Sequence, residues 1–289
     1  MSSVKPTQTP LEIFPYAQWA PKLEVFRQRY QAAVPFPHII LENLLDSGIL
    51  DTALAEFPGI ESTAWIHYLH LNEKKFGKTD RQSFGPTLQA IVHELNSPRF
   101  VEFLSRLTGI EGLFPDDSLE GGGLHQIPPG GFLNVHADFT VHPHHRTWRR
   151  RVNLLLYLNK DWEDSYGGHL ELWDQQMKRR VHWIAPLFNR SVIFNTDADS
   201  FHGHPDPLTC PAGRTRKSMA FYYFTKEASP PRVRSTEYRA RPGDGVKGIG
   251  IYLDKMVLRF YDGVKRTLGF DDQWASRTLA AIERFFKKR

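Results

Sequence analysis

A series of short segments rich in β-branched and aromatic residues fills the middle of the chain, starting near residue 120. The segments are GFLNVHAD, RVNLLLYLN, GGHLELW, RVHWIAP, RSVIFN and KSMAFYYFT. Glycine, proline and asparagine turns separate them. Short strands divided by turns in this way are typical of a β-sandwich or β-barrel. We therefore expect an all-β core in this part of the chain.

Helical patterns flank the β-rich region on both sides. We predict helices over 18–33, 86–96 and 98–108 before it, and over 249–268 and 272–287 after it. The expected fold class is α+β, with N-terminal helices and a C-terminal helical extension around the β core.

Three regions follow from these patterns. Residues 1–115 form an N-terminal support region of helices and a strand, and residues 116–228 form the β core. Residues 229–289 hold a basic, proline-rich linker and the C-terminal helices, which we expect to pack on the core or to form a homodimer interface.

Composition narrows the class of protein. The chain has 289 residues, of which 40% are hydrophobic and 24% charged, as in an ordinary globular protein with a sizeable core. Its net charge of +5 is a mild argument for anionic ligands, and we expect no nucleic-acid partner. A single cysteine, a polar start and the lack of a long apolar run predict a cytoplasmic protein without a membrane span.

One β-rich segment carries the pair His136 and Asp138. Residues i and i+2 of a strand point to the same side, so both side chains can reach one metal ion. His202, in a later segment, can supply the third ligand, and His204 competes with it for this role. Two imidazoles and one carboxylate bind ferrous iron on one face and leave the opposite face open.

A second pair, Arg216 and Ser218, lies on one face of the segment KSMAFYYFT and its lead-in. A guanidinium binds a carboxylate through two parallel hydrogen bonds, and a serine hydroxyl can add a third. Arg214 is an alternative carboxylate-binding residue, but no serine follows it two positions later. A metal with a carboxylate clamp nearby suits a 2-oxo diacid, whose 2-oxo and carboxylate oxygens would chelate iron.

Residues 126–224 resemble the 2-oxoglutarate/iron(II) oxygenases of the prolyl 4-hydroxylase type. The motifs that carry the resemblance are YLNKDW (157–162), GGHLELW (167–173), FHGHP (201–205) and RKSMAFYYF (216–224), in the order that the family uses. The resemblance implies a double-stranded β-helix, or jelly roll, with the site inside the barrel. It also implies a dioxygenase that uses Fe(II), 2-oxoglutarate and O2, with ascorbate as a supporting reductant.

The resemblance assigns roles to individual residues. His136, Asp138 and His202 would ligate iron, while Arg216 would bind the distal carboxylate of 2-oxoglutarate together with Ser218.

Three further residues receive roles in the same way. Tyr157 would hydrogen-bond the distal carboxylate as well. Gln126 occupies a position where relatives carry another cosubstrate contact, commonly a tyrosine. Arg150 lies near a position that faces the substrate in relatives.

The expected reaction is hydroxylation of a C–H bond with release of succinate and CO2. Related halogenases have a small residue where this chain keeps Asp138, so hydroxylation is favoured over halogenation. The substrate is left open between a prolyl residue of a protein and a small molecule or glycan intermediate. Three consecutive arginines, at positions 149–151, favour an anionic substrate.

Two alternative interpretations accompany this hypothesis. A non-enzymatic jelly-roll module that binds a sugar or a peptide would share the fold. The histidine-rich segment VHPHHR, with His142, His144 and His145, is interpreted as a solvated loop rather than a second metal site.

Overall fold

The structure is a computed structural model that describes residues 12–62, 65–246, 248 and 250–251. The two predicted C-terminal helices lie outside the described residues, except that residues 250–251 of the predicted helix 249–268 are described. Among the described residues, no helix is long and apolar enough to cross a membrane.

The helices precede the β core, as predicted. They are α1 (Tyr16–Trp19), α2 (Leu23–Ala32), α3 (Ser47–Ala55), α4 (Pro86–Leu95) and α5 (Pro98–Thr108). The side chain of Asp46 accepts hydrogen bonds from the backbone N–H groups of Gly48 and Ile49, so it caps α3. The helix predicted over 18–33 is split, because Pro21 lies in a short 3₁₀ turn between α1 and α2.

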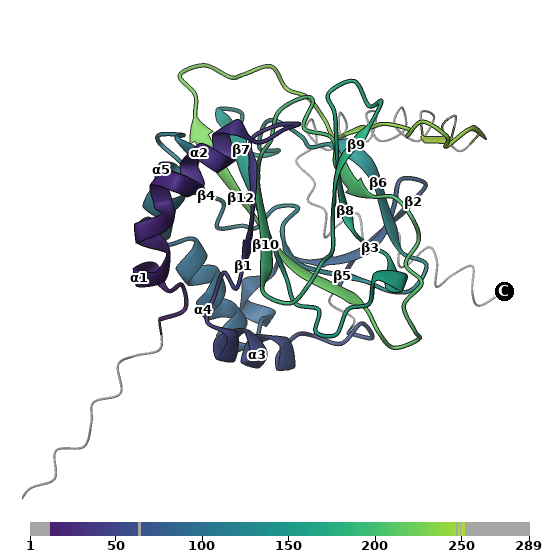
Figure 1. Cartoon of the computed structure of the whole chain (residues 1–289), viewed down its shortest axis with the longest axis horizontal. Helices are drawn as coiled ribbons and strands as arrows, with labels where there is room; N and C mark the ends of the chain where they lie inside the picture. Colours follow the sequence, from purple (N-terminus) through teal and green to yellow (C-terminus); the bar gives the residue numbers. More distant parts are fainter. Residues whose placement is uncertain (1–11, 63–64, 247, 249, 252–289) are drawn as a thin grey trace, which may run out of the picture.

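The strands form one antiparallel sheet that curls into a half-barrel, consistent with a jelly roll (Figure 1). Their order is β1-β10-β7-β12-β5-β3-β6-β11-β8-β9, with β2 paired to β3, β4 to β12 and β13 to β6. Their bounds are β1 (His38–Glu42), β2 (Ile66–His70), β3 (Glu73–Lys78), β4 (Phe114–Pro115), β5 (Gly123–Ile127), β6 (Phe132–Ala137), β7 (Trp148–Tyr157), β8 (Leu170–Trp173), β9 (Arg180–Ile184), β10 (Arg190–Asn195), β11 (His202–His204), β12 (Arg216–Lys226) and β13 (Glu237–Tyr238).

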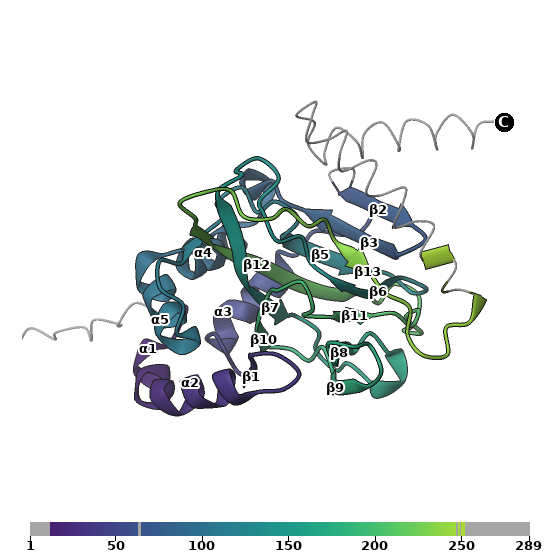
Figure 2. The same cartoon turned by 90° about the horizontal axis from the view of Figure 1, so that it is seen from above.

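Strand β7 divides the molecule into an outer and an inner layer. Its residues Val152, Leu154 and Leu156 are buried in the same cluster as the apolar side chains of the helices, which gather on one side of the sheet (Figures 1 and 2). Tyr157 belongs instead to a cluster with apolar residues of β8 and β10. The alternation along one strand therefore separates a helix-covered face from a face that lines the barrel interior.

Strands from the first part of the chain belong to this sheet. β1 pairs with β10, and β3 lies between β5 and β6, where Phe76 is opposite Gln126 and Glu73 is opposite Leu133. The region predicted as N-terminal support therefore contributes directly to the barrel wall. The boundary near residue 115 stays a prediction.

Candidate active site

Two neighbouring strands bring the predicted metal ligands together. His136 on β6 is directly opposite His202 on β11, so their side chains share one face of the sheet. Asp138 follows β6 by one residue, and its carboxylate oxygens lie 3.6 Å from His136 Nε2 and 3.5 Å from His202 Nε2. The potential ligand atoms all lie within 4.8 Å of one another, and in the described part of the chain no other such group occurs. The predicted triad is confirmed, with His202 rather than His204 as its third member.

The two imidazoles are oriented as metal ligands require. The Nδ1 atoms of His136 and His202 lie 2.9 Å from the backbone carbonyl oxygens of Asn134 and Ser200. An Nδ1–H that donates to a carbonyl leaves the Nε2 lone pair for a metal ion. Burial and the neighbouring His136 lower the pKa of His202 to about 4, so its imidazole is neutral at neutral pH. The donor set and its orientation fit Fe(II).

Arg150 and Asn153 hold the carboxylate of Asp138. Arg150 Nη2 and Asn153 Nδ2 lie 3.1 Å and 2.7 Å from Asp138 Oδ2. Arg150 Nε also donates to Asn153 Oδ1 at 2.9 Å, which joins the two donors into one unit. Burial opposes ionisation of Asp138, but the charge of Arg150 holds the pKa of this carboxyl well below its usual value. The carboxylate therefore stays ionised and ready for a cation.

The structure places Arg150 against Asp138, and the substrate contact that the resemblance implied stays a prediction. Its side chain is 1% exposed, and its guanidinium carbon lies 3.4 Å from the centre of the Tyr222 ring and 4.6 Å from that of Phe139. Its charge is directed at Asp138, whereas Arg149 pairs with Asp197 at 3.1 Å. Two of the three arginines of the run therefore already pair with carboxylates.

The predicted carboxylate-binding residues Arg216 and Ser218 both lie on β12. Ser218 is opposite Tyr157 of β7, which places both side chains on the inner face. The Arg216 guanidinium carbon lies 4.9 Å from the centre of the Tyr157 ring, and its Nε donates to the carbonyl of Gly168 at 2.8 Å. Gly168 has a φ of +72°, and a Cβ there would lie 2.9 Å from Arg216 Cδ, so only glycine leaves room for the arginine.

Arg216 is a buried cation without a counter-charge. It is 4% exposed, and none of the described carboxylates forms an ion pair with it. Burial lowers its pKa from the usual value, which reflects the cost of the uncompensated charge. An isolated charge in the interior is unfavourable unless an anion pairs with it. The site therefore fits the distal carboxylate of 2-oxoglutarate.

Gln126 is the one predicted cosubstrate residue that the structure does not bring to this site. It is opposite Lys217 on β12, and its Nε2 donates to Thr215 Oγ1 at 2.8 Å, on the outer face of the strand. The inner position on β5 belongs to His125, which is opposite Ser218. Burial of its ring and the charge of Lys75 lower the pKa of His125 to about 3, so this half-buried side chain is neutral. A shift of one residue along a strand reverses the face, and the sequence pattern did not reveal it.

In the histidine-rich segment His144 and His145 are exposed, as predicted, and only His142 differs. His142 is 3% exposed rather than solvated, and its Nε2 lies 3.4 Å from Asp116 Oδ2. Although burial opposes it, hydrogen bonds from His142 and Ser118 lower the pKa of Asp116 to about 2. This pair fixes the segment that follows Asp138 against the sheet.

A residue beyond the β core completes the surroundings of the metal ligands. β13 pairs with β6, and Tyr238 is opposite His136. The centres of the Tyr238 and His136 rings lie 5.4 Å apart, and the Tyr238 hydroxyl donates to Glu73 Oε1 at 3.3 Å. Glu73 also pairs with Lys75 at 2.8 Å. Tyr238 lies in the stretch predicted as a linker, because a strand of two residues has no periodic pattern to detect.

We expect the Tyr238→Ala substitution to weaken metal binding about tenfold, because residues that orient a ligand typically contribute factors of this order. Tyr238→Phe keeps the ring against His136 and is expected to bind the metal nearly as well as the unchanged protein. Calorimetric titration with Mn(II), in place of the oxygen-sensitive Fe(II), measures both affinities. Equal affinities for the alanine variant and the unchanged protein would rule out this role.

Comparisons with known proteins agree with the geometry. The sequence model of the 2OG-Fe(II) oxygenase superfamily matches residues 122–224. Over 77 residues the chain is 34% identical to prolyl 3-hydroxylase OGFOD1 of Mus musculus, a stretch that spans 25% of this chain and 14% of that protein.

Solved structures share the fold. A prolyl-4-hydroxylase of Pseudomonas putida matches with a TM-score of 0.50 and 16% identity, over 70% of this chain and 100% of that one. A prolyl hydroxylase of Trichoplax adhaerens, in complex with a hypoxia inducible factor peptide, matches with a TM-score of 0.52 and 18% identity, over 75% and 94%. At these identities, the two structures establish the fold alone.

Proposed function

Because this chain belongs to the 2OG-Fe(II) oxygenase superfamily, we propose that it hydroxylates a prolyl residue of a protein. The reaction would consume 2-oxoglutarate and O2 and release succinate and CO2. The observation that carries the choice of substrate is the 34% identity, over 77 residues, to a prolyl 3-hydroxylase. A sugar- or peptide-binding module without enzymatic activity would need neither the triad nor the unpaired Arg216.

Each part of the site has a task in this reaction. His136, Asp138 and His202 would hold Fe(II). The bound metal would activate O2 for the oxidation of both 2-oxoglutarate and the substrate. Arg216 and Ser218 would bind the distal carboxylate of 2-oxoglutarate and so direct its 2-oxo end toward the triad.

The inner wall of the barrel excludes water from the cosubstrate. Leu170, Leu172, Val192 and Phe194, which pack around Tyr157, are at most 2% exposed. Charge-assisted hydrogen bonds are stronger in such an environment than in water. The wall therefore strengthens the contact between Arg216 and its carboxylate.

The surroundings of Asp138 favour an uncharged substrate. The positive charge of Arg150 is already compensated by Asp138 at 3.1 Å. The aromatic rings of Tyr222 and Phe139, both half-buried, flank this arginine. Half-buried rings beside a neutralised ion pair suit an apolar ring such as that of proline better than an anion.

A peptide assay tests the proposal. The protein is incubated with Fe(II), 2-oxoglutarate and ascorbate in air, together with a library of proline-containing peptides. We expect some of these peptides to raise succinate formation and to gain one oxygen atom by mass spectrometry. Matched peptides with alanine in place of proline are expected to do neither. Oxygen transfer to the alanine peptides, or stimulation by small molecules alone, would contradict a prolyl substrate.

A further inference from the structure

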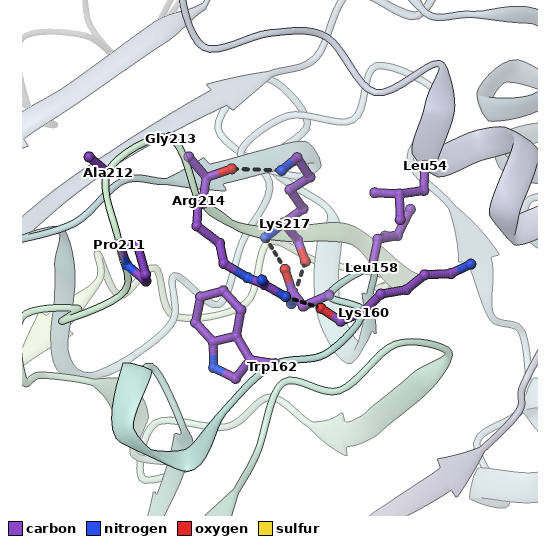
Figure 3. Close-up of a pocket in the computed structure, with 11 residues that line it drawn as sticks. Leu54, Leu158, Lys160, Trp162, Pro211, Ala212, Gly213, Arg214 and Lys217 are labelled. Atoms are coloured by element: carbon purple, nitrogen blue, oxygen red, sulfur yellow. Dashed lines mark hydrogen bonds between the residues drawn. The ribbon is translucent and has the colours of Figure 1, made fainter.

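We propose that the outer face of the barrel holds a second binding site, which takes a small organic anion with an apolar body and a carboxylate or phosphate group. The site is a pocket of about 460 Å³ between α3, the end of β7, and residues 211–217 (Figure 3). Ligand-binding clefts commonly have volumes of about 300–1,000 Å³. The inference does not rest on the proposed function.

Three basic residues and no acidic residue line the pocket: Lys160, Arg214 and Lys217. The Arg214 guanidinium donates to the backbone carbonyls of Lys160 and Asp161, and Lys217 Nζ donates to Thr215 Oγ1 at 2.8 Å. Within the described ranges, neither Arg214 nor Lys217 forms an ion pair with a carboxylate. Two cations fixed by neutral groups leave their charge available to an anion.

The charge of Lys217 is poorly compensated where it lies. The side chain is half-buried, and both burial and the nearby Arg214 lower its pKa. Lys160 differs, because it already pairs with Asp51 at the exposed edge of the pocket. An anion between Arg214 and Lys217 would therefore relieve both the burial and the mutual repulsion of these two cations.

Apart from Asn159 and Thr215, the remainder of the pocket wall is apolar or glycine. Trp162 is 7% exposed, and its indole N–H donates to the carbonyl of Gly167 at 3.0 Å, which fixes the ring. Leu54, Leu158 and Pro211 add aliphatic surface. A fixed aromatic ring beside two cations favours an organic anion over a simple inorganic ion.

The pocket is separate from the cosubstrate site. Lys217 lies between Arg216 and Ser218 on β12, and alternate residues of a strand point to opposite faces. Lys217 is opposite Gln126, whereas Ser218 is opposite the inward-facing His125. Arg216 and Lys217 therefore face opposite sides of β12, and Arg214, which precedes the strand, lines the pocket together with Lys217.

Calorimetry on the full chain, saturated with Mn(II) and 2-oxoglutarate, tests the inference with four probes. They are phenyl phosphate, benzoate, inorganic phosphate and the neutral benzyl alcohol. We expect phenyl phosphate or benzoate, or both, to bind at least tenfold more tightly than benzyl alcohol and inorganic phosphate. The stronger of the two identifies the anionic group that the pocket prefers. No advantage of either organic anion over the neutral alcohol would overturn the inference.

Variants locate the binding. The double substitution Arg214→Met and Lys217→Met is expected to weaken binding of the organic anion about tenfold or more, since hydrogen bonds to charged groups are among the strong ones. Ala212→Phe, in the exposed part of the lining, tests the same pocket by filling it while keeping both cations. Lys178→Met, an exposed lysine elsewhere, is the matched control and should bind as the unchanged protein does. Undiminished binding in the double variant and in Ala212→Phe would overturn the inference.

Discussion

Replacing Arg216 with methionine is expected to raise the Kd for 2-oxoglutarate about a hundredfold, because two charge-assisted hydrogen bonds to the distal carboxylate are lost. Each such bond contributes roughly 1.5 kcal/mol or more. The side chain is 4% exposed, so water cannot easily take its place. Titration of the Mn(II)-loaded protein with 2-oxoglutarate measures the change.

The same substitution should weaken binding of 2-oxoglutarate without lowering the stability of the ligand-free protein. Methionine removes a buried charge that has no counter-ion among the described residues, so the protein without ligand is expected to be at least as stable as before. Lys226→Met, an exposed position at the end of β12, is the control and should leave 2-oxoglutarate affinity unchanged. An Arg216→Met variant that binds 2-oxoglutarate within threefold of the unchanged protein would refute the clamp.

Replacing Arg150 with methionine is expected to have the opposite effect on stability. Removing one partner of a buried ion pair typically costs about 3–5 kcal/mol, because the other charge stays behind. Here the charge left behind is Asp138, which Asn153 would hold alone. Metal affinity should fall about 10–100-fold, since the carboxylate loses the group that orients it.

A double-mutant cycle separates this effect from general damage to the fold. Asp138→Asn removes the charge that Arg150 compensates, so adding it to Arg150→Met is expected to cost much less than the sum of the two single substitutions. Chemical denaturation of the metal-free protein gives the free energy of unfolding for all four proteins. Additive losses would show that Arg150 does not act through Asp138.

Two of the three metal ligands could be predicted from local strand alternation, and His202 was assigned through the family resemblance. The alternation of a strand places His136 and Asp138 on one side, and the same rule places Arg216 with Ser218. The structure confirms the triad and brings Arg216, Ser218 and Tyr157 to the inner face of the barrel. The two faces of β7 were predictable for the same reason.

The remainder depends on information that a single sequence does not contain. Gln126 and His125 are neighbours, and only the pairing register between β5 and β12 decides which of them faces inward. Arg150 has a long side chain, so its position on β7 did not reveal that it reaches Asp138. Tyr238 joins the site through long-range pairing of β13 with β6, which leaves no trace in local periodicity.

The most direct test of the account is whether Fe(II) and 2-oxoglutarate bind together at the triad. Without O2, adding 2-oxoglutarate to the Fe(II)-loaded protein should produce a visible metal-to-ligand charge-transfer band that saturates at one equivalent. The band should be absent in His202→Ala, since His202 completes the triad. No band in the unchanged protein, or an undiminished band in His202→Ala, would contradict the assignment of this site.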